Sequence, residues 1–268
     1  MKFNLEQDKC HVMGILNVTP DSFFDGGKYS TLDKVMVRVN EMITEGVDII
    51  DIGGESSRPG SDRISIQEEL DRIVPVVSKI RDNYDIPISI DSMKSDVVEE
   101  LLPFNINIMN DISSLSDDNF INILKKTDAY ICLMHMIEDP STMQNNPSYR
   151  NVTEEVFKYL KDKSRYCIEN GIDPKKIIID PGFGFGKTLD HNYELLKNLD
   201  KFIEINTNIL VGISRKSMIG NLLNQGLDKR LYGSLSAAVI SLIKHAKIIR
   251  THDIRETKIA IDIIESLT

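Results

Sequence analysis

The chain has 268 residues, of which 41% are hydrophobic, enough to bury the core of one large domain or two small ones. Its net charge of −9 argues against nucleic acid or an anionic membrane as a general partner, although a few converging basic residues could still bind an anionic small molecule. We find no apolar run long enough to cross a bilayer and no signal-peptide pattern. The three cysteines, Cys10, Cys132 and Cys167, lack metal-ligand spacing, so we expect reduced thiols in a cytoplasmic protein.

Short apolar segments rich in β-branched residues predict eight buried strands. In chain order they cover residues 11–18, 47–52, 87–91, 107–111, 130–135, 177–180, 208–213 and 247–252. Long loops follow the first two strands, at residues 19–27 and 53–61. The first loop carries Phe23 and Phe24, which solvated loops seldom need, so we interpret it as a lid.

Apolar residues at helical spacing separate most of these strands. The predicted helices cover residues 32–43, 65–82, 152–168, 235–245 and 257–267. Ser30 is expected to cap the first helix, Ser65 and Glu68 form a possible capping box for the second, and Ser95 is expected to cap a further short helix.

This alternation of strands and helices predicts a (β/α)8 barrel, formed by a single domain over residues 1–268. A doubly wound open sheet is the competing architecture. It is disfavoured because the first strand runs into Asn17-Val18-Thr19-Pro20, where a dinucleotide-binding fold requires a glycine-rich turn.

The loop after the sixth strand is glycine-rich and ends on Lys187 and Thr188. Its end resembles a phosphate-binding loop, but that motif needs glycine at the position of Pro181, so we disfavour a nucleotide hydrolase. What remains is the carboxylate of Asp180 at the end of a buried strand, beside backbone N–H groups that could approach a ligand.

Polar residues stand at the carboxyl ends of most predicted strands, where barrel enzymes place their active sites. They are Asn17, Asp51, Asp91, Asn110, His135, Asp180, Lys216, Arg250 and His252. Burying two carboxylates and two cations at one mouth is unfavourable unless they bind a ligand or one another. For Asp51 and Asp111 a helix-capping role stays equally open, and for His135 we favour a core position.

The types of these residues indicate a ligand. Carboxylates and the amide of Asn110 suit the amino and ring N–H donors of a flat heterocycle, while Lys216 suits its carbonyl oxygen. Arg58, Arg250 and His252 could bind phosphate oxygens, and Asn17 could help to hold a divalent ion that bridges those oxygens.

With these residues assembled, the chain closely resembles the dihydropteroate synthases, folate-pathway enzymes that sulfonamides inhibit. The resemblance covers nearly the whole chain and rests on seven motifs in order, at residues 13–23, 51–60, 90–92, 110–112, 180–188, 212–217 and 250–253. Two departures are small: Ser57 stands where threonine is usual, and Phe24 stands where a serine is common.

The resemblance implies condensation of 6-hydroxymethyl-7,8-dihydropterin diphosphate with 4-aminobenzoate, giving 7,8-dihydropteroate and pyrophosphate through a cationic pterin methylene. It also implies a homodimer and an Mg²⁺ ion. The catalytic residues would be Asp91, Asp180, Lys216, Arg58, Arg250 and His252. The pterin would meet Asp91, Asn110, Met134, Asp180, Lys216 and Arg250; the diphosphate would meet Asn17 (with the metal), Arg58, Arg250 and His252; and 4-aminobenzoate would meet Ser57, Arg58, Pro59, Phe183 and Ser217.

Two other functions remain as alternatives. A pterin-binding methyltransferase that acts on methyltetrahydrofolate would share the acidic ring-binding residues but has no use for the basic diphosphate site. A non-catalytic pterin-binding protein would be indicated by loss of Asn17, Arg58 or Lys216, and all three are present.

Overall fold

The computed structural model describes residues 3–5, 9–19, 31–56, 60–137, 140 and 142–267. Most of the predicted lid, with Phe23, Phe24 and the capping residue Ser30, lies outside these ranges. So do Ser57, Arg58 and Pro59 of the second long loop, and their predicted roles stay predictions.

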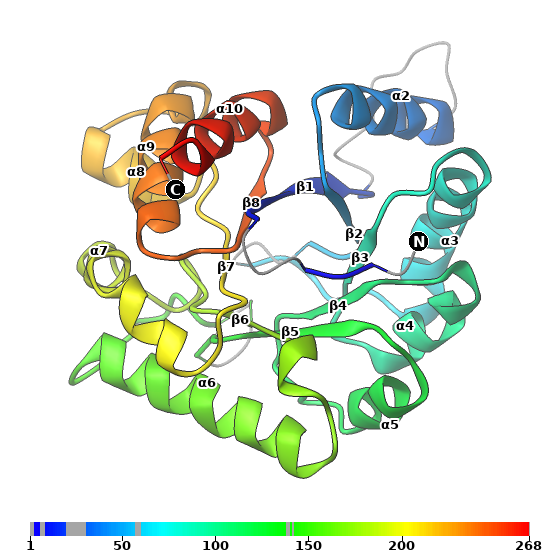
Figure 1. Cartoon of the computed structure of the whole chain (residues 1–268), viewed down its shortest axis with the longest axis horizontal. Helices are drawn as coiled ribbons and strands as arrows, with labels where there is room; N and C mark the ends of the chain where they lie inside the picture. The colour runs from blue at the N-terminus through cyan, green and yellow to red at the C-terminus, as the bar shows by residue number, and fades with distance from the viewer. Residues whose placement is uncertain are drawn as a thin grey trace.

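The described residues form one sheet of eight parallel strands in the order β6-β5-β4-β3-β2-β1-β8-β7. The strands are β1 (His11–Asn17), β2 (Ile49–Gly53), β3 (Ile88–Asp91), β4 (Ile108–Asp111), β5 (Tyr130–Met134), β6 (Ile177–Asp180), β7 (Leu210–Val211) and β8 (Ile248–Thr251). Figure 1 shows them gathered at the centre of the molecule, with the helices around them. The predicted (β/α)8 barrel is confirmed.

The junction between β6 and β7 differs from the other strand pairings. Strand β7 has two residues instead of the predicted six, and an isolated bridge between Ile179 and Ile209 links it to β6. The backbone N–H of Ile179 donates to the carbonyl of Asn208 at 3.0 Å, and the side-chain amide of Asn208 donates to the carbonyls of Lys175 and Ile177. A single bridge and a side chain thus take the place of a regular ladder. We call this junction the β6–β7 seam.

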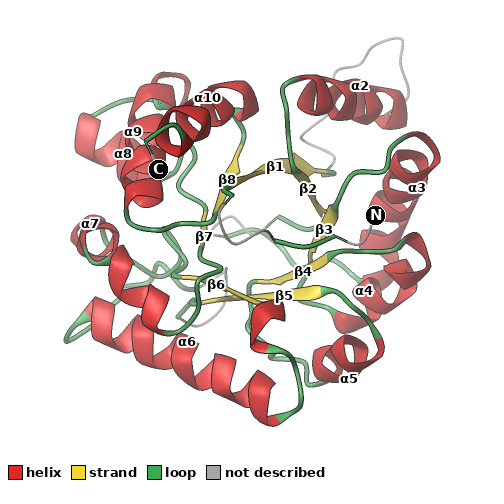
Figure 2. Cartoon of the chain, in the orientation of Figure 1, coloured by secondary structure: helices red, strands yellow, loops and turns green. Residues whose placement is uncertain are grey.

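Helices lie outside the strands, coloured red in Figure 2. They are α2 (Thr31–Thr44), α3 (Ile66–Asn83), α4 (Ser95–Leu101), α5 (Asn119–Lys126), α6 (Val152–Glu169), α7 (Leu189–Lys197), α8 (Ser217–Leu223), α9 (Leu231–Ile243) and α10 (Ile254–Glu265). Short 3-10 helices are η1 (Leu102–Phe104), η2 (Pro174–Lys176), η3 (Leu199–Glu204) and η4 (Leu227–Lys229). Within the described ranges, we find no helix both long and apolar enough to cross a membrane.

Two of the capping predictions can be checked. Ser65 caps α3, as predicted, by accepting a hydrogen bond from the backbone N–H of Glu68 at 3.1 Å. The second half of the predicted capping box is absent, because the Glu68 carboxylate accepts from Arg72 at 2.5 Å instead. The prediction for Ser95 is wrong: Lys94 is the N-cap of α4, and Ser95 is its first helical residue, whose hydroxyl donates to Asp117.

The barrel interior has a lower apolar layer. It is built by Met13, Ile49, Ile108, Tyr130, Cys132, Ile178, Leu210 and Ile248, with Leu5 buried among them. Because side chains alternate between the two faces of a strand, the residue two positions further along each strand also faces inward. A second, larger core lies between the outer face of the sheet and the helices. The strand ends above the apolar layer are therefore where polar side chains converge.

Candidate active site

Above the lower apolar layer, five strands each place one polar side chain in the mouth of the barrel. These side chains are Asp51 on β2, Asp91 on β3, Asn110 on β4, Asp180 on β6 and Arg250 on β8. Met134 on β5 shares this level, because it is in register with Asp180. The predicted convergence at the mouth is thus present in the fold.

Arg250 links two of the carboxylates. Its Nε donates to Oδ2 of Asp51 and its Nη2 donates to Oδ2 of Asp91, each at 2.7 Å. These contacts raise the pKa of Arg250 above its usual range despite burial, so the guanidinium stays charged. Burial raises the pKa of Asp91 to about 7, against the opposing effect of Arg250. Asp91 is therefore close to its titration point at neutral pH.

Asp51 is not a helix cap. It is fully buried and accepts hydrogen bonds from both Arg250 and Asn110, whose Nδ2 lies 3.3 Å from each carboxylate oxygen. Asp111, by contrast, stabilises the turn that follows it. Its carboxylate accepts hydrogen bonds from the backbone N–H groups of Ser113 and Leu115, at 2.8 and 2.6 Å. The sequence left these two carboxylates equivalent, and the fold separates them.

Asp180 is held by the loop that follows it. Its Oδ1 accepts from the backbone N–H of Gly182 at 2.7 Å, and burial raises the pKa of its carboxyl. Gly182 has a φ of +71°, and a Cβ there would lie 1.9 Å from the carbonyl oxygen of His135. Only glycine fits this turn, and the turn sets the orientation of the carboxylate.

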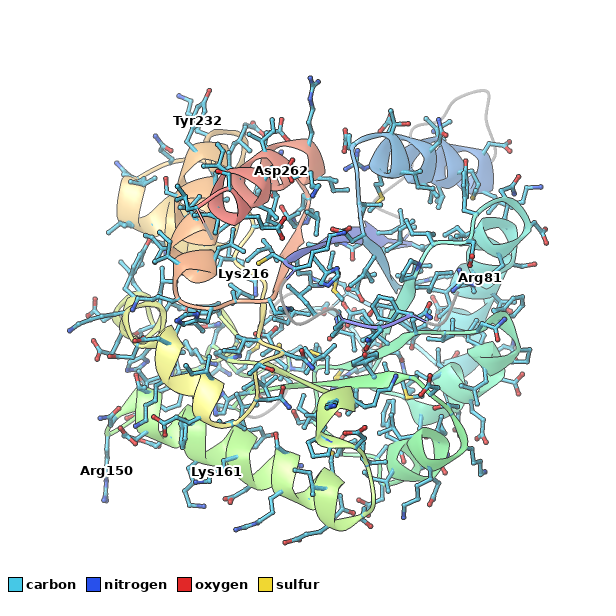
Figure 3. The ribbon with its side chains drawn as sticks, in the orientation of Figure 1. Arg81, Arg150, Lys161, Lys216, Tyr232 and Asp262 are labelled. Carbon is cyan, nitrogen blue, oxygen red and sulfur yellow. The ribbon has the colours of Figure 1, made fainter. Side chains whose placement is uncertain are left out.

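Lys216 lies after β7 as the N-cap of α8, and Figure 3 labels it toward the middle of the molecule. Its Nζ donates to the carbonyl of Phe183 and lies 4.5 Å from the ring centroid of Phe185. Burial lowers the pKa of Lys216 to about 8, although the carboxylate of Asp180 opposes that shift. An ammonium beside these carboxylates suits a polar, electron-rich ring.

Phe183 does not lie where its predicted role needs it. Its side chain is fully buried in the outer core, so only its backbone reaches Lys216. Phe185 is the partly exposed aromatic of the same loop. The sequence did not distinguish the two, because alternate residues of an irregular loop follow no fixed face.

Lys187 has a structural role that the sequence did not reveal. It is almost fully buried and donates to the carbonyls of Gly182 and Phe185, each at 2.9 Å, and lies 3.0 Å from Nδ1 of His135. Burial lowers the pKa of His135 to about 3, so this imidazole is neutral. The core position favoured for His135 agrees with these contacts. Lys187 ties the glycine-rich loop instead of binding phosphate.

Of the remaining predicted residues, those that the structure describes are His252, Ser217 and Asn17, and they lie at the edge of the mouth. His252 has its Nδ1 3.0 Å from the hydroxyl of Ser214, whose oxygen also accepts from the His252 backbone N–H at 3.2 Å. Ser217 is exposed at the start of α8, next to Lys216. Asn17 is the last residue of β1, paired with Gly53.

The comparisons with known proteins give one family. A family model for pterin binding enzymes matches residues 13–252. The chain belongs to the pterin-binding enzyme family.

Within this family the similar proteins are dihydropteroate synthases, as the sequence motifs predicted. The one from Escherichia coli (strain K12) is 47% identical over 263 residues, covering 98% of this chain and 93% of the relative. The solved structure from Yersinia pestis, in complex with a sulfonamide drug, has a TM-score of 0.91 at 42% identity and covers 98% of this chain and 96% of that one. The one from Xanthomonas albilineans, in complex with 7,8-dihydropteroate, has a TM-score of 0.89 at 32% identity, with coverages of 98% and 95%.

Ion pairs surround the start of the loop after β2. Glu55, at its start, is bound by the ammonium of Lys94 and by Arg63, whose Nη1 lies 3.3 Å from its Oε1. The same ammonium donates to Oε2 of buried Glu69 at 2.6 Å. Motif spacing did not point to Lys94, because its partners lie 25 and 39 residues away. This network fixes Glu55, the described start of that loop.

A resident metal centre is not apparent in the part of the chain that the structure describes, where no group of three or more His, Cys, Asp or Glu side chains is placed to hold an ion. Asn17 offers one neutral amide oxygen at the mouth. That donor fits Mg²⁺ only when phosphate oxygens and water complete its coordination, which is how this ion is commonly bound beside phosphates.

Proposed function

We propose that this protein is a dihydropteroate synthase, which joins 6-hydroxymethyl-7,8-dihydropterin diphosphate to 4-aminobenzoate and releases pyrophosphate. The names of its relatives, and the sulfonamide and 7,8-dihydropteroate in two related structures, support this reaction. The observation that carries the proposal is the convergence of Asp91, Asn110 and Asp180 with Lys216 at one barrel mouth.

The pterin ring would lie above the lower apolar layer. Asp91, Asn110 and Asp180 would accept its amino and ring N–H groups, and Lys216 would donate to its carbonyl oxygen. Met134, in register with Asp180, would pack against the ring. Arg250 would lie over one face of it, because planar guanidinium groups stack well on flat rings.

The diphosphate would lie at the edge of the mouth. Arg58, Arg250 and His252 would bind its oxygens, and Asn17 would contribute an oxygen to the Mg²⁺ that accompanies it. When bound there, the ion would neutralise charge on the leaving pyrophosphate.

We place 4-aminobenzoate between the second loop and the start of α8, near Ser57, Arg58, Pro59 and Ser217. We propose Phe185 as its aromatic contact in place of Phe183, because Phe185 is partly exposed and Phe183 is fully buried.

The geometry supports a dissociative reaction. As pyrophosphate leaves, electron release from the dihydropterin ring would form a cationic methylene, and the carboxylates of Asp91 and Asp180 would stabilise that positive charge. The amine of 4-aminobenzoate would then attack, so the protein needs to orient it more than to activate it. Closed loops would keep water from attacking in its place.

The test is to incubate purified protein, Mg²⁺ and the dihydropterin diphosphate with and without 4-aminobenzoate, and to measure pyrophosphate and pteroate. Formation of 7,8-dihydropteroate together with pyrophosphate supports the proposal. Pterin binding without any condensation product would contradict it. Methyl transfer from methyltetrahydrofolate would then be measured to separate a methyltransferase from a non-catalytic binding protein.

We further propose a cytoplasmic homodimer. The three cysteines form no disulfide, which suits a reducing compartment. For the dimer, large apolar side chains are exposed on adjoining helices α8, α9 and α10, and such patches commonly mark protein interfaces. They include Leu222, Leu223, Tyr232, Ile243, Ile259 and Ile263. We call this group the α8–α10 face.

A further inference from the structure

Asp51 contacts two of the side chains that the proposed function assigns to the pterin, yet it is more deeply buried than either. It is fully buried on β2, while Asn110 is on β4 and Arg250 on β8. None of the Asp51 side chain is exposed, whereas Asn110 is 4% exposed and the side chain of Arg250 is 19% exposed. A side chain at this depth reaches a ligand only through its neighbours.

An ionised carboxylate has acceptors only, so its neighbours must present donors to it. Arg250 does so with Nε at 2.7 Å. Asn110 does so with Nδ2, which lies 3.3 Å from both oxygens of Asp51. The carboxamide of Asn110 therefore has a fixed orientation. Its Oδ1 has no hydrogen-bond partner among the described residues and is left as an acceptor at the mouth.

We propose that Asp51 is a positioning residue that fixes the Asn110 carboxamide, so that the mouth presents an acceptor and not a donor to the pterin ring. The inference rests on the proposed function, because it takes Asn110 as a ring contact. The same carboxylate holds the Nε edge of Arg250, so that Asp91 can exchange its bond with Nη2 for one with the ring while the guanidinium stays anchored.

The substitution Asp51→Asn tests this role, because the amide at position 51 keeps one hydrogen-bond acceptor and gains a donor. The charged guanidinium of Arg250 is the stronger donor and would retain the single oxygen. The new NH2 group would then face Nδ2 of Asn110, and Asn110 would rotate to present its oxygen downward and its NH2 to the mouth. The NH2 group of Asn110 would then face the N–H donors of the pterin ring, which need an acceptor there.

The experiment measures affinity for 6-hydroxymethyl-7,8-dihydropterin by calorimetry in a set of full-length variants. Asp51→Asn is expected to weaken binding about 10- to 100-fold, the loss typical of one mismatched buried hydrogen bond. Asn110→Ala should weaken it as well, and Asp51→Asn should have little further effect in the Asn110→Ala background. The KM for 4-aminobenzoate should be unchanged in Asp51→Asn.

The decisive variant exchanges the two residues, as Asp51→Asn with Asn110→Asp. The amide at position 51 would then give its oxygen to Arg250 and its NH2 to the new carboxylate, which would keep a free acceptor at the mouth. Recovery of pterin affinity relative to Asp51→Asn supports the inference, since a loss of stability alone would not be reversed this way. Asp111→Asn is the matched control: a strand-end carboxylate that bonds only to its own turn, where affinity should not change.

Two results would overturn the inference: no recovery in the exchanged variant, or additive losses in Asp51→Asn with Asn110→Ala. Failure of the proposed function looks different, because the unsubstituted protein would then form no 7,8-dihydropteroate even where it binds the pterin. If it binds and Asn110→Ala has no effect, Asn110 is not a ring contact, and the inference fails while the function stands.

Discussion

Asp180 gains its orientation from the backbone of the loop that follows it. One oxygen accepts from Gly182, which leaves the other for the mouth. The cations Lys216, Lys187 and Arg250 lie near the buried carboxylate and act against its desolvation. A ring that donates two hydrogen bonds and carries partial positive charge suits this position, because it would replace lost hydration without adding a negative charge.

We expect Asp180→Asn to weaken pterin binding about 10- to 100-fold while the barrel stays folded, because the amide keeps an acceptor for Gly182 but turns an NH2 group toward the ring donors. Calorimetry with the pterin measures the loss. Asp173→Asn is the matched control: its Oδ1 accepts from the N–H of Lys175 in the same two-residue pattern, on the exposed side before β6. Equal affinity in the Asp180 variant would remove Asp180 from the ring site.

The pKa shifts predict a pH optimum for pterin affinity. Burial lowers the pKa of Lys216 to about 8, so its charged donor is present below that pH and is lost as pH rises through it. Burial raises the pKa of Asp91 to about 7, so its carboxylate is present above that pH and is lost as pH falls through it. Affinity should therefore be highest between about 7 and 8, measured by calorimetry across pH.

Lys216→Arg tests the alkaline limb of this profile. Arginine keeps its charge throughout the accessible range, so the variant should lose the fall in affinity above pH 8 even if its affinity is lower overall. An alkaline limb that persists in the variant would assign the titration to another group.

At the residue scale, the sequence identified which strand ends carry chemistry but not how they pair. For Asp51 and Asp111 a capping role was equally open, and only the contacts of Asp51 with Asn110 on β4 and Arg250 on β8 distinguish them. The same holds for Lys187, whose burial results from contacts with His135 and Gly182 that no local pattern encodes.

The loop after β6 is the element on which the site most depends. The backbone N–H of Gly182 in this loop orients Asp180, and the carbonyl of Phe183 accepts a hydrogen bond from Lys216. Lys187 stabilises the loop by donating to the carbonyl of Gly182. Sequence patterning recognised a glycine-rich loop here, but not which glycine is indispensable.

We expect Gly182→Ala to be much more damaging than Gly171→Ala. Both glycines have positive φ, at +71° and +89°, so each alanine costs about 1–2 kcal/mol of backbone strain. At Gly171 the added methyl meets open space, whereas at Gly182 it would collide with the carbonyl of His135. The collision adds about 1–3 kcal/mol of destabilisation.

Denaturant unfolding of both variants measures the difference, and pterin affinity should fall only for Gly182→Ala. Similar losses of stability in the two would show that the loop can move away from His135, and that it does not fix Asp180 rigidly.

Element boundaries show where sequence patterns are reliable. Runs such as Ile177–Asp180 are found as predicted, because a strand buried on both faces needs continuous apolar residues. Helix α9 begins at Leu231 instead of 235, and α10 at Ile254 instead of 257, because glycine or polar residues follow their first apolar residue and interrupt the apolar run. Strand β7 is shorter than its apolar run because Asn208 bonds across to η2 and β6.

For the whole molecule, the alternation of strands and helices was sufficient to predict the barrel, whereas surface association was not predictable. The α8–α10 face is spread over three helices whose exposed residues follow no single periodicity. Figure 3 shows Tyr232 at the outer edge of α9, and 80% of that residue is exposed.

If this face forms the homodimer, Tyr232→Asp should shift the protein from dimer to monomer, because a carboxylate in an apolar interface loses hydration without gaining a partner. Sedimentation velocity measures the shift. Val37→Asp, at a residue on α2 that is 59% exposed, is the control and should leave the association state unchanged. A Tyr232→Asp protein that remains dimeric would place the interface elsewhere.

The β6–β7 seam has a consequence for hydrogen exchange. Asp180 ends the strand on one side of it and Lys216 follows the strand on the other, and the strands themselves share an isolated bridge. Amides around Ile179 and Ile209 should therefore exchange through local opening, at a lower free energy than those between β1 and β2. A pterin bound by both Asp180 and Lys216 would join the two sides, so ligand should slow exchange at the seam more than elsewhere in the sheet.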